Sequence, residues 1–136
     1  MSTPLYKKLG IKEGFSICVI GYKDYASLFD ELPEALVYSE IQKGKLDFIH
    51  LFIDSFNDLK AYAPQLKNSI HPNGLIWISW PKQSSAVETD LNRDIIRRYI
   101  LETGLVDVKV TSINTIWSGL KFVVRLKDRK NITRSN

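Results

Sequence analysis

The sequence predicts a single α/β domain of three layers, and three observations support this fold class. Short apolar runs rich in branched residues alternate with amphipathic segments, which is typical of strands and helices in succession. Two such runs near the C-terminus are separated by only a short link, which indicates a closing antiparallel hairpin. The length of 136 residues suits one domain with a buried core. We therefore expect helices on both faces of a mostly parallel sheet.

The N-terminal segment predicts a helix, a strand and a second helix. Residues 4–9 form a short helical pattern that Thr3 can cap and Gly10 can end. Residues 15–20, FSICVI, are a continuous apolar run, typical of a strand that is buried on both faces. Asp24 can cap a helix of about two turns that ends at the next proline.

The next segment contains one strongly predicted strand and one open case. Residues 47–53, DFIHLFI, predict a buried strand. Before it, residues 36–39 are either a short edge strand or an extended segment. The doubt comes from the connection, residues 41–46, because a parallel crossover generally needs a dozen residues or more.

The middle of the chain predicts a helix lying on the sheet, followed by a turn and a central strand. Apolar residues recur at spacings of three and four, as in the stripe of such a helix. They are Phe56, Leu59, Ala63, Leu66 and Ile70. Pro64 interrupts this pattern and is expected to kink or restart the helix. Asn73-Gly74 predicts a turn before the strand at residues 75–80.

The C-terminal segment predicts one more helix and the closing hairpin. The helix is expected to begin near Thr89 or Asp90 and to end at Gly104. Residues 106–113 alternate between apolar and polar side chains, so this strand should be half exposed, and residues 120–126 form the last strand.

The net charge of +4 is concentrated at the C-terminus. Residues 127–136 carry four basic residues against one acidic residue, a net charge of +3, which leaves +1 for residues 1–126. We interpret residues 1–126 as the single domain and residues 127–136 as a basic, disordered tail. The alternative is an arm that binds nucleic acid or a membrane surface.

Several segments resemble class I S-adenosylmethionine-dependent methyltransferases. LGIKEGFSICVIG is similar to their opening helix, turn and strand, LDFIHLF to their fourth strand, and IHPNGLIWISWP to their fifth. Four further motifs, WPK, TDL, GLVDVKV and WSGLKFV, resemble a bacterial family of short, methyltransferase-like proteins without an assigned activity. This resemblance implies a truncated, Rossmann-like, class I methyltransferase-like sheet.

The sequence departs from the methyltransferase pattern at the cofactor site. Those enzymes have a Gly-rich turn after the first strand, but here Gly21 is followed by Tyr22 and Tyr25, which we expect to fill the site. Glu40 would take the place of the ribose-binding carboxylate, although such an acid is more commonly solvated surface. The third strand and its helices are missing, and with them the adenine side of the pocket.

A candidate ligand site lies at the carboxyl edge of the predicted sheet, where α/β proteins bind ligands. Two remote segments should meet there, and their polar and aromatic residues could bind a small anion. They are Lys82, Ser84, Ser85, Asp90, Trp117, Ser118 and Lys121. In the alternative interpretation the lysines pair with Asp90 or with helix ends, and Trp117 belongs to the core.

No catalytic or metal site is predicted. His50 lies inside a strand and His71 in a turn, and we interpret both as structural. Cys18, the one cysteine, is expected to be buried and inert. The N-terminus lacks the apolar segment of a signal peptide, so we expect a cytoplasmic protein.

Three functional hypotheses follow. The main one is a non-catalytic, methyltransferase-like domain, without cofactor, that binds a protein partner or a small anion. The alternative is a minimal S-adenosylmethionine-dependent methyltransferase in which Tyr22, Tyr25 or Trp117 stacks on adenine, with Gly21 and Glu40 at the cofactor. The third is weak nucleic-acid binding through the tail.

Overall fold

The computed structural model describes residues 3–42 and 46–129. The strands are β1 (Ser16–Ile20), β2 (Leu36–Tyr38), β3 (Leu46–Phe52), β4 (Ile70–Pro81), β5 (Leu105–Ser112) and β6 (Trp117–Val124). The α-helices are α1 (Leu5–Leu9), α2 (Phe56–Leu66) and α3 (Arg93–Leu101), and the 3-10 turns are η1 (Tyr25–Leu28) and η2 (Lys67–Ser69).

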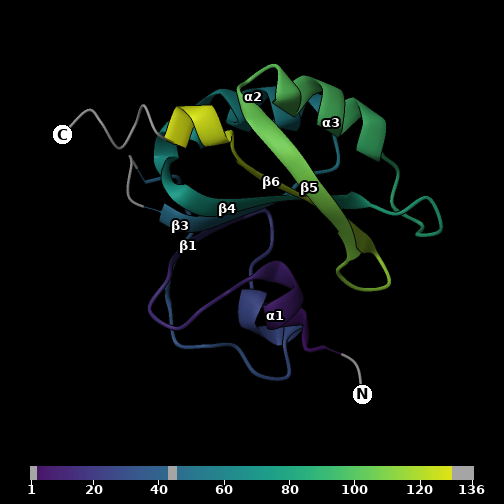
Figure 1. Ribbon diagram of the computed structural model, residues 1–136. Coiled ribbons are helices and arrows are strands. Elements are labelled where there is room, and N and C mark those ends of the chain that lie inside the picture. Colours follow the sequence, from purple (N-terminus) through teal and green to yellow (C-terminus); the bar gives the residue numbers. More distant parts are fainter. Residues whose placement is uncertain (1–2, 43–45, 130–136) are drawn as a thin grey trace.

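All six strands form one sheet in the order β2-β1-β3-β4-β6-β5. Strands β1 to β4 run parallel to one another, and β6 lies antiparallel between β4 and β5. Helices α2 and α3 cover one face of the sheet, and α1 lies on the other (Figure 1). The predicted α/β class, with a mostly parallel sheet and an antiparallel C-terminal hairpin, is therefore confirmed.

Two predicted turns and helices differ from the structure. Asn73 and Gly74 do not form a turn but lie inside β4, in an irregular stretch where Leu46 pairs with Ile70 and Phe48 already pairs with Leu75. A Cβ at Gly74 would lie 2.4 Å from the Ile70 side chain, so a larger residue at this position would require Ile70 to move. The helix expected after Asp24 is only the single turn η1, whose N-cap residue makes no side-chain capping bond.

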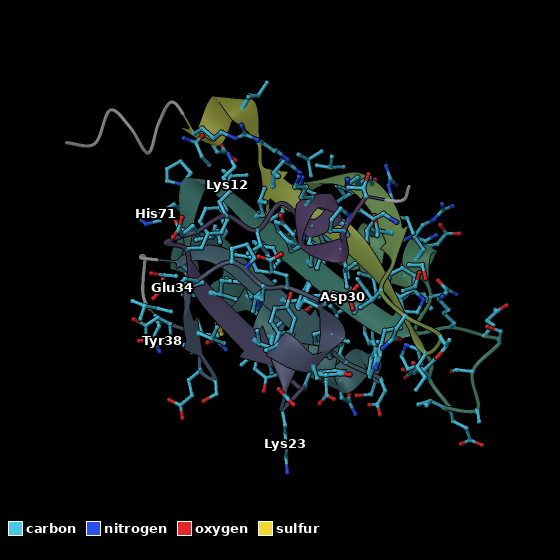
Figure 2. All side chains as sticks on the ribbon, turned by 90° about the horizontal axis from the view of Figure 1, so that it is seen from below. Lys12, Lys23, Asp30, Glu34, Tyr38 and His71 are labelled. Carbon is cyan, nitrogen blue, oxygen red and sulfur yellow. The ribbon has the colours of Figure 1, made fainter. Side chains whose placement is uncertain are left out.

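The segment at 36–39 does contain a strand, β2, which forms one edge of the sheet. Its three residues pair with residues 16–18 of β1, and all three are exposed. Tyr38 lies at the rim of the molecule (Figure 2). Because β2 is so short, the chain has to return only about 10 Å along the sheet to start β3, which a short connection can span.

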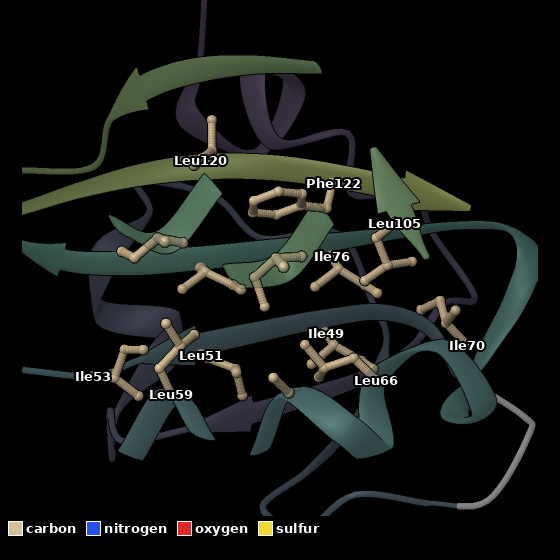
Figure 3. Packing of buried hydrophobic residues seen from close by; sticks show 14 of the residues in the cluster. Ile49, Leu51, Ile53, Leu59, Leu66, Ile70, Ile76, Leu105, Leu120 and Phe122 are labelled. Atoms are coloured by element: carbon tan, nitrogen blue, oxygen red, sulfur yellow. The ribbon is translucent and has the colours of Figure 1, made fainter. Parts of the chain in front are cut away.

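The core has one part on each face of the sheet. The larger part lies between the sheet and helices α2 and α3, where Leu59 and Leu66 pack beneath the sheet (Figure 3). These two residues and Ile100 have no exposed surface. The smaller part lies on the face of α1 and η1 and contains Phe48 and Trp77. The Trp77 indole N–H donates a hydrogen bond of 2.8 Å to the carbonyl of Leu9, which anchors α1 to the sheet.

Helix α3 begins later than predicted. Its N-cap is Asn92, whose side chain accepts a hydrogen bond of 2.9 Å from the Ile95 N–H, and not Thr89 or Asp90. Thr89 and Asp90 instead have roles in the preceding loop, where Thr89 contacts Asp54 between β3 and α2, and Asp90 contacts Phe56, the first residue of α2.

The chain stays folded past the predicted domain end at residue 126. Residues 126–129 form a helical turn, and Asp128 in this turn pairs with Lys67 at 2.9 Å. Residues 130–136 lie outside the described residues, so a basic tail that is disordered or binds nucleic acid stays a prediction for that segment.

Candidate active site

The backbone after β1 approaches the end of β3 so closely that position 21 must be a glycine. Gly21 has a φ of +87°, which side chains other than glycine rarely adopt. In addition, a Cβ at this position would lie 2.2 Å from the carbonyl oxygen of Phe52. Two independent constraints therefore require glycine at the carboxyl ends of these two adjacent parallel strands, where ligands bind in α/β folds.

A cavity of about 730 Å³ opens beside Gly21, in the size range of small-molecule sites. It extends between the β1–η1 segment and the exposed strand β2. Its lining residues are Val19, Gly21, Tyr22, Lys23, Tyr25, Ala26, Leu32, Val37, Tyr38 and Ser39. The expectation that Tyr22 and Tyr25 fill this site is wrong, because both residues line a cavity that is open beside Gly21.

Each tyrosine is held against the protein by aromatic contacts. The Tyr22 ring lies 4.8 Å from that of Phe52, and the Tyr25 ring packs edge-on against Phe29 at 5.1 Å. Tyr25 is almost fully buried, and this burial raises the pKa of its hydroxyl well above the usual value. It therefore stays a neutral phenol at any physiological pH.

The polar groups at the cavity are few. Ser39 provides a hydroxyl at the end of β2. Glu40, the predicted ribose-binding residue, is exposed one residue further along and is not among the residues that line the cavity. Lys23 lines the mouth, but its side chain points away from the protein (Figure 2).

A second cleft, of about 750 Å³, lies at the carboxyl ends of β3 and β4. Its lining residues are Asp54, Ser55, Lys82, Gln83, Val87, Glu88, Thr89, Asp90, Leu91 and Asn92. Two of the predicted site residues, Lys82 and Asp90, therefore do meet here. They do not pair with each other: Lys82 Nζ donates to Ser112 Oγ at 2.6 Å, and Asp90 Oδ1 accepts from the Phe56 N–H at 2.8 Å.

Ser84 and Ser85 occupy the loop that follows Lys82. The Ser85 hydroxyl donates a hydrogen bond of 2.7 Å to the Lys82 carbonyl and so closes a tight turn. Ser84 is exposed and lies outside the cleft lining. These serines shape the loop next to the cleft.

The other half of the predicted ligand site lies elsewhere. Trp117 packs edge-on against Phe52 at 5.2 Å, in the core part on the α1 face, and Ser118 pairs with Trp80 inside the sheet. Lys121 lies four residues along β6 from Trp117, about 13 Å away. The two-lysine anion site is therefore not assembled.

Lys121 is in register with Trp77 on one side and with Lys109 on the other. Burial, and then the charge of Lys109, lower the pKa of its ammonium group. Two lysines in register on neighbouring strands were not expected from the sequence, since the strand register decides which residues are neighbours.

A buried polar row near the cavity was also missed. His50 has no exposed surface, and its ring nitrogens lie 2.7 Å from Tyr25 Oη and 2.7 Å from Ser79 Oγ. Burial lowers the pKa of the imidazole to about 3, so it is neutral. The sequence did contain a signal for this row, because His50 and Ser79 are polar residues inside two apolar runs that become the adjacent strands β3 and β4.

The structural roles of Cys18 and His71 fit their surroundings. Cys18 is fully buried in β1, and burial raises the pKa of its thiol to about 11, which makes it a poor nucleophile. His71 Nε2 lies 4.0 Å from an oxygen of Asp47 at a half-exposed position. In the part of the chain that the structure describes, no three His, Cys, Asp or Glu side chains are grouped to hold a metal ion.

Comparison with known proteins places the fold. No protein-family model and no curated protein sequence matches this chain. Among solved structures, it is similar to an S-adenosylmethionine-dependent methyltransferase from Aquifex aeolicus, with 16% identity, a TM-score of 0.60 and 88% of each chain covered.

Two further similar structures contain a cofactor product. One is a didemethyltoxoflavin N1-methyltransferase from Burkholderia thailandensis with bound S-adenosylhomocysteine (11% identity, TM-score 0.57, 87% of this chain and 73% of that one). The other is magnesium protoporphyrin IX methyltransferase from Synechocystis, also with S-adenosylhomocysteine (11% identity, TM-score 0.55, 83% and 75% covered).

These similarities change the functional interpretation. The main expectation, a non-catalytic domain that binds a protein partner or small anion, is contradicted, because the similar structures are S-adenosylmethionine-dependent methyltransferases. They favour the alternative hypothesis of a minimal enzyme. No helix among the described residues has the length and apolar character to cross a membrane.

The strand order and the similar solved structures together show that the chain has a truncated form of the Rossmann-like class I methyltransferase fold.

Proposed function

We propose that this protein binds S-adenosylmethionine in the cavity beside Gly21 and is a methyltransferase of minimal size. The observation that carries the proposal is the contact between Gly21 and Phe52 at the edge of this open cavity. The cavity lies at the carboxyl ends of β1 and β2, in a fold shared with solved S-adenosylmethionine-dependent methyltransferases.

The residues that line the cavity fit such a cofactor. Gly21 leaves its backbone uncovered, so a ligand can approach the peptide groups directly. Tyr22 and Tyr38 offer aromatic faces for a purine, and Ser39 offers a hydroxyl for the ribose or the amino acid part. When bound, the cofactor supplies an activated methyl group on its sulfonium.

The acceptor would bind in the cleft at the ends of β3 and β4. The end of β3 lies between the two hollows in the chain of contacts, because Phe52 approaches Gly21, which lines the cavity, while Asp54, two residues further on, lines the cleft. Thr89 Oγ1 donates a hydrogen bond of 2.6 Å to the Asp54 carbonyl, which fixes the loop over this edge. Asp54 and Glu88 give the cleft acidic groups that would orient an acceptor and hold its proton.

Calorimetry with S-adenosylmethionine and S-adenosylhomocysteine tests the binding step. We expect dissociation constants in the micromolar range for both, and much weaker binding of ATP, which shares the adenosine but not the amino acid part. If neither compound produces heat or a thermal shift at millimolar concentration, the proposal is wrong.

The transfer step needs a separate measurement. The protein is incubated with a methyl-labelled cofactor and with separated small-molecule, protein and nucleic-acid fractions of a cell extract. Label should enter one fraction and should fall when Asp54 is replaced by Ala. Binding of the cofactor without transfer to any fraction would reduce the proposal to a cofactor-binding domain.

A further inference from the structure

Tyr25, His50 and Ser79 form a hydrogen-bonded row that joins η1 to two central strands. The distances are 2.7 Å from Tyr25 Oη to His50 Nδ1 and 2.7 Å from His50 Nε2 to Ser79 Oγ. His50 and Ser79 have no exposed surface, and only 4% of Tyr25 is exposed. Of the three residues, only Tyr25 lines the cavity beside Gly21.

Two hydrogen bonds and one stacked aromatic ring hold the imidazole of His50 in place. Its two nitrogens bind Tyr25 and Ser79, and its face stacks on the Phe52 ring with a centroid distance of 4.1 Å and an interplanar angle of 22°. A leucine in this position would bury more apolar surface without the cost of desolvating two nitrogens. The arrangement is therefore better explained by what His50 orients than by core stability alone.

His50 helps to position the part of the cavity lining that Tyr25 provides. Within the described residues, the other hydrogen bonds of this turn are local: Ser27 donates to the Asp24 carbonyl, and the Phe29 N–H donates to the Ala26 carbonyl. The Tyr25 hydroxyl thus supplies the polar link between η1 and the sheet. A single 3-10 turn has little stability of its own, so its position depends on such a link.

His50 also helps to position the part of the cavity lining that Gly21 and Tyr22 provide, because Phe52 contacts both His50 and these residues. The Phe52 ring stacks on the imidazole and also contacts the Tyr22 ring at 4.8 Å. The Phe52 carbonyl is the atom that approaches Gly21. A tilt of the imidazole would therefore move both the ring that supports Tyr22 and the strand end that supports the glycine.

We propose that His50 is a positioning residue for the cavity: it contacts no ligand but holds Tyr25 and Phe52, and through them Tyr22, in the arrangement that binds the cofactor. This inference rests on the proposed cofactor role of the cavity. It names a role for a buried histidine that the methyl transfer itself does not use.

Two conservative variants test the role of His50. Tyr25→Phe keeps the ring and removes the hydroxyl, and it should weaken S-adenosylhomocysteine binding about tenfold. Ser79→Ala removes the other hydrogen bond of the same imidazole at a residue that does not line the cavity, and it should weaken binding about threefold. A local role of Tyr25 alone would leave the second variant unchanged, so wild-type affinity in Ser79→Ala overturns the proposal.

A stability control separates positioning from general destabilisation. Ile96→Val creates a small cavity in the core on the opposite face, under α3, to which Ile96 belongs, and should lower the melting temperature without changing the dissociation constant. If this variant loses affinity to the same extent as Tyr25→Phe, the effect is one of stability and the positioning role is wrong.

Hydrogen exchange without ligand tests the inference even if the cofactor assignment fails. Tyr25→Phe should increase amide exchange in residues 22–29 and leave α3 protected as in the wild type. Unchanged exchange in residues 22–29 would overturn the positioning role. Absence of cofactor binding by the wild-type protein, in contrast, would overturn the proposed function while the exchange result still decides the role of His50.

Discussion

Tyr38 of β2 lies opposite Cys18 of β1 in the parallel register, yet Cys18 has no exposed surface and 37% of Tyr38 is exposed. The sheet therefore passes from full burial to solvent between two adjacent strands. The methyltransferases that the sequence resembles continue with a third strand and its helices at this point. Here the exposed end of β2 becomes a wall of the candidate cofactor cavity.

Tyr38→Ala should weaken cofactor binding because it removes an aromatic face from the cavity. We expect a dissociation constant about fivefold to tenfold higher, measured by calorimetry with S-adenosylhomocysteine. Leu36→Ala is the matched control: it lies on the same strand, is 63% exposed and does not line the cavity. Equal affinities of the two variants would exclude Tyr38 from the site.

Gly21→Ala should destabilise the protein and abolish cofactor binding, since its Cβ would collide with the Phe52 carbonyl. Gly14→Ala provides a control for the backbone cost, because Gly14 has a nearly identical φ of +86° but no atom within 4 Å of an added Cβ. We expect Gly14→Ala to cost about 1 kcal/mol and to bind normally. Chemical denaturation and calorimetry measure both effects, and similar behaviour of the two variants would show that the contact at Phe52 is unimportant.

Asp90→Ala should lower the free energy of unfolding by about 1 kcal/mol, because Asp90 Oδ1 satisfies the free N–H of Phe56 at the start of α2. Asp90→Asn keeps an acceptor oxygen and should lose less. Glu88→Ala, in the same loop, serves as the control. Urea denaturation distinguishes these cases, and an Asn variant as unstable as the Ala variant would point to the charge of Asp90 instead of its hydrogen bond.

The free energy of unfolding should fall as the pH is lowered below 7. The reason is that His50 binds a proton in the unfolded state at a higher pH than in the folded state. Burial lowers the folded-state pKa of His50 from 6.5 to about 3, so the unfolded chain takes up this proton first. The contribution is complete above pH 6.5 and is lost progressively towards pH 3, at up to about 1.4 kcal/mol per pH unit. Between pH 7 and pH 5 this amounts to roughly 2 kcal/mol.

The comparison with His50→Gln isolates this effect from the other titrating groups. The variant is expected to be less stable at pH 7, but its stability should depend less on pH between 7 and 5. Parallel pH profiles of wild type and variant, measured by urea denaturation, would mean that His50 is not held neutral in the folded protein.

Much of the architecture could be read from local patterns. The apolar run at 15–20 and the DFIHLFI segment became β1 and β3 within one residue at each end, because a strand covered on both faces needs continuous apolar residues. The hairpin of β5 and β6 was also expected, from two strand patterns in succession and the short link between them. In contrast, Asn73-Gly74 was a misleading turn signal, since these residues lie inside β4, in an irregular stretch between its pairings with Leu46 and Phe48 of β3.

The candidate site was predicted only in part. Lys82 and Asp90 do reach the same cleft, because both follow the carboxyl end of β4 closely along the chain. Lys121 does not reach this cleft, because the antiparallel register of β6 and β4 places it opposite Trp77, four residues before the end of β4. Tyr22 and Tyr25 were expected to close the cofactor site, but their ring orientations depend on Phe52 and His50, which are far away in sequence.

Local sequence information thus fixed the order of strands and helices, because hydrophobic periodicity and chain stiffness act over a few residues. Whether the cavity beside Gly21 is open, which carboxylate caps α2 and which polar groups satisfy His50 were decided by tertiary packing. These features depend on contacts between residues 25 to 34 positions apart, and side-chain directions at that range follow from strand register and ring packing.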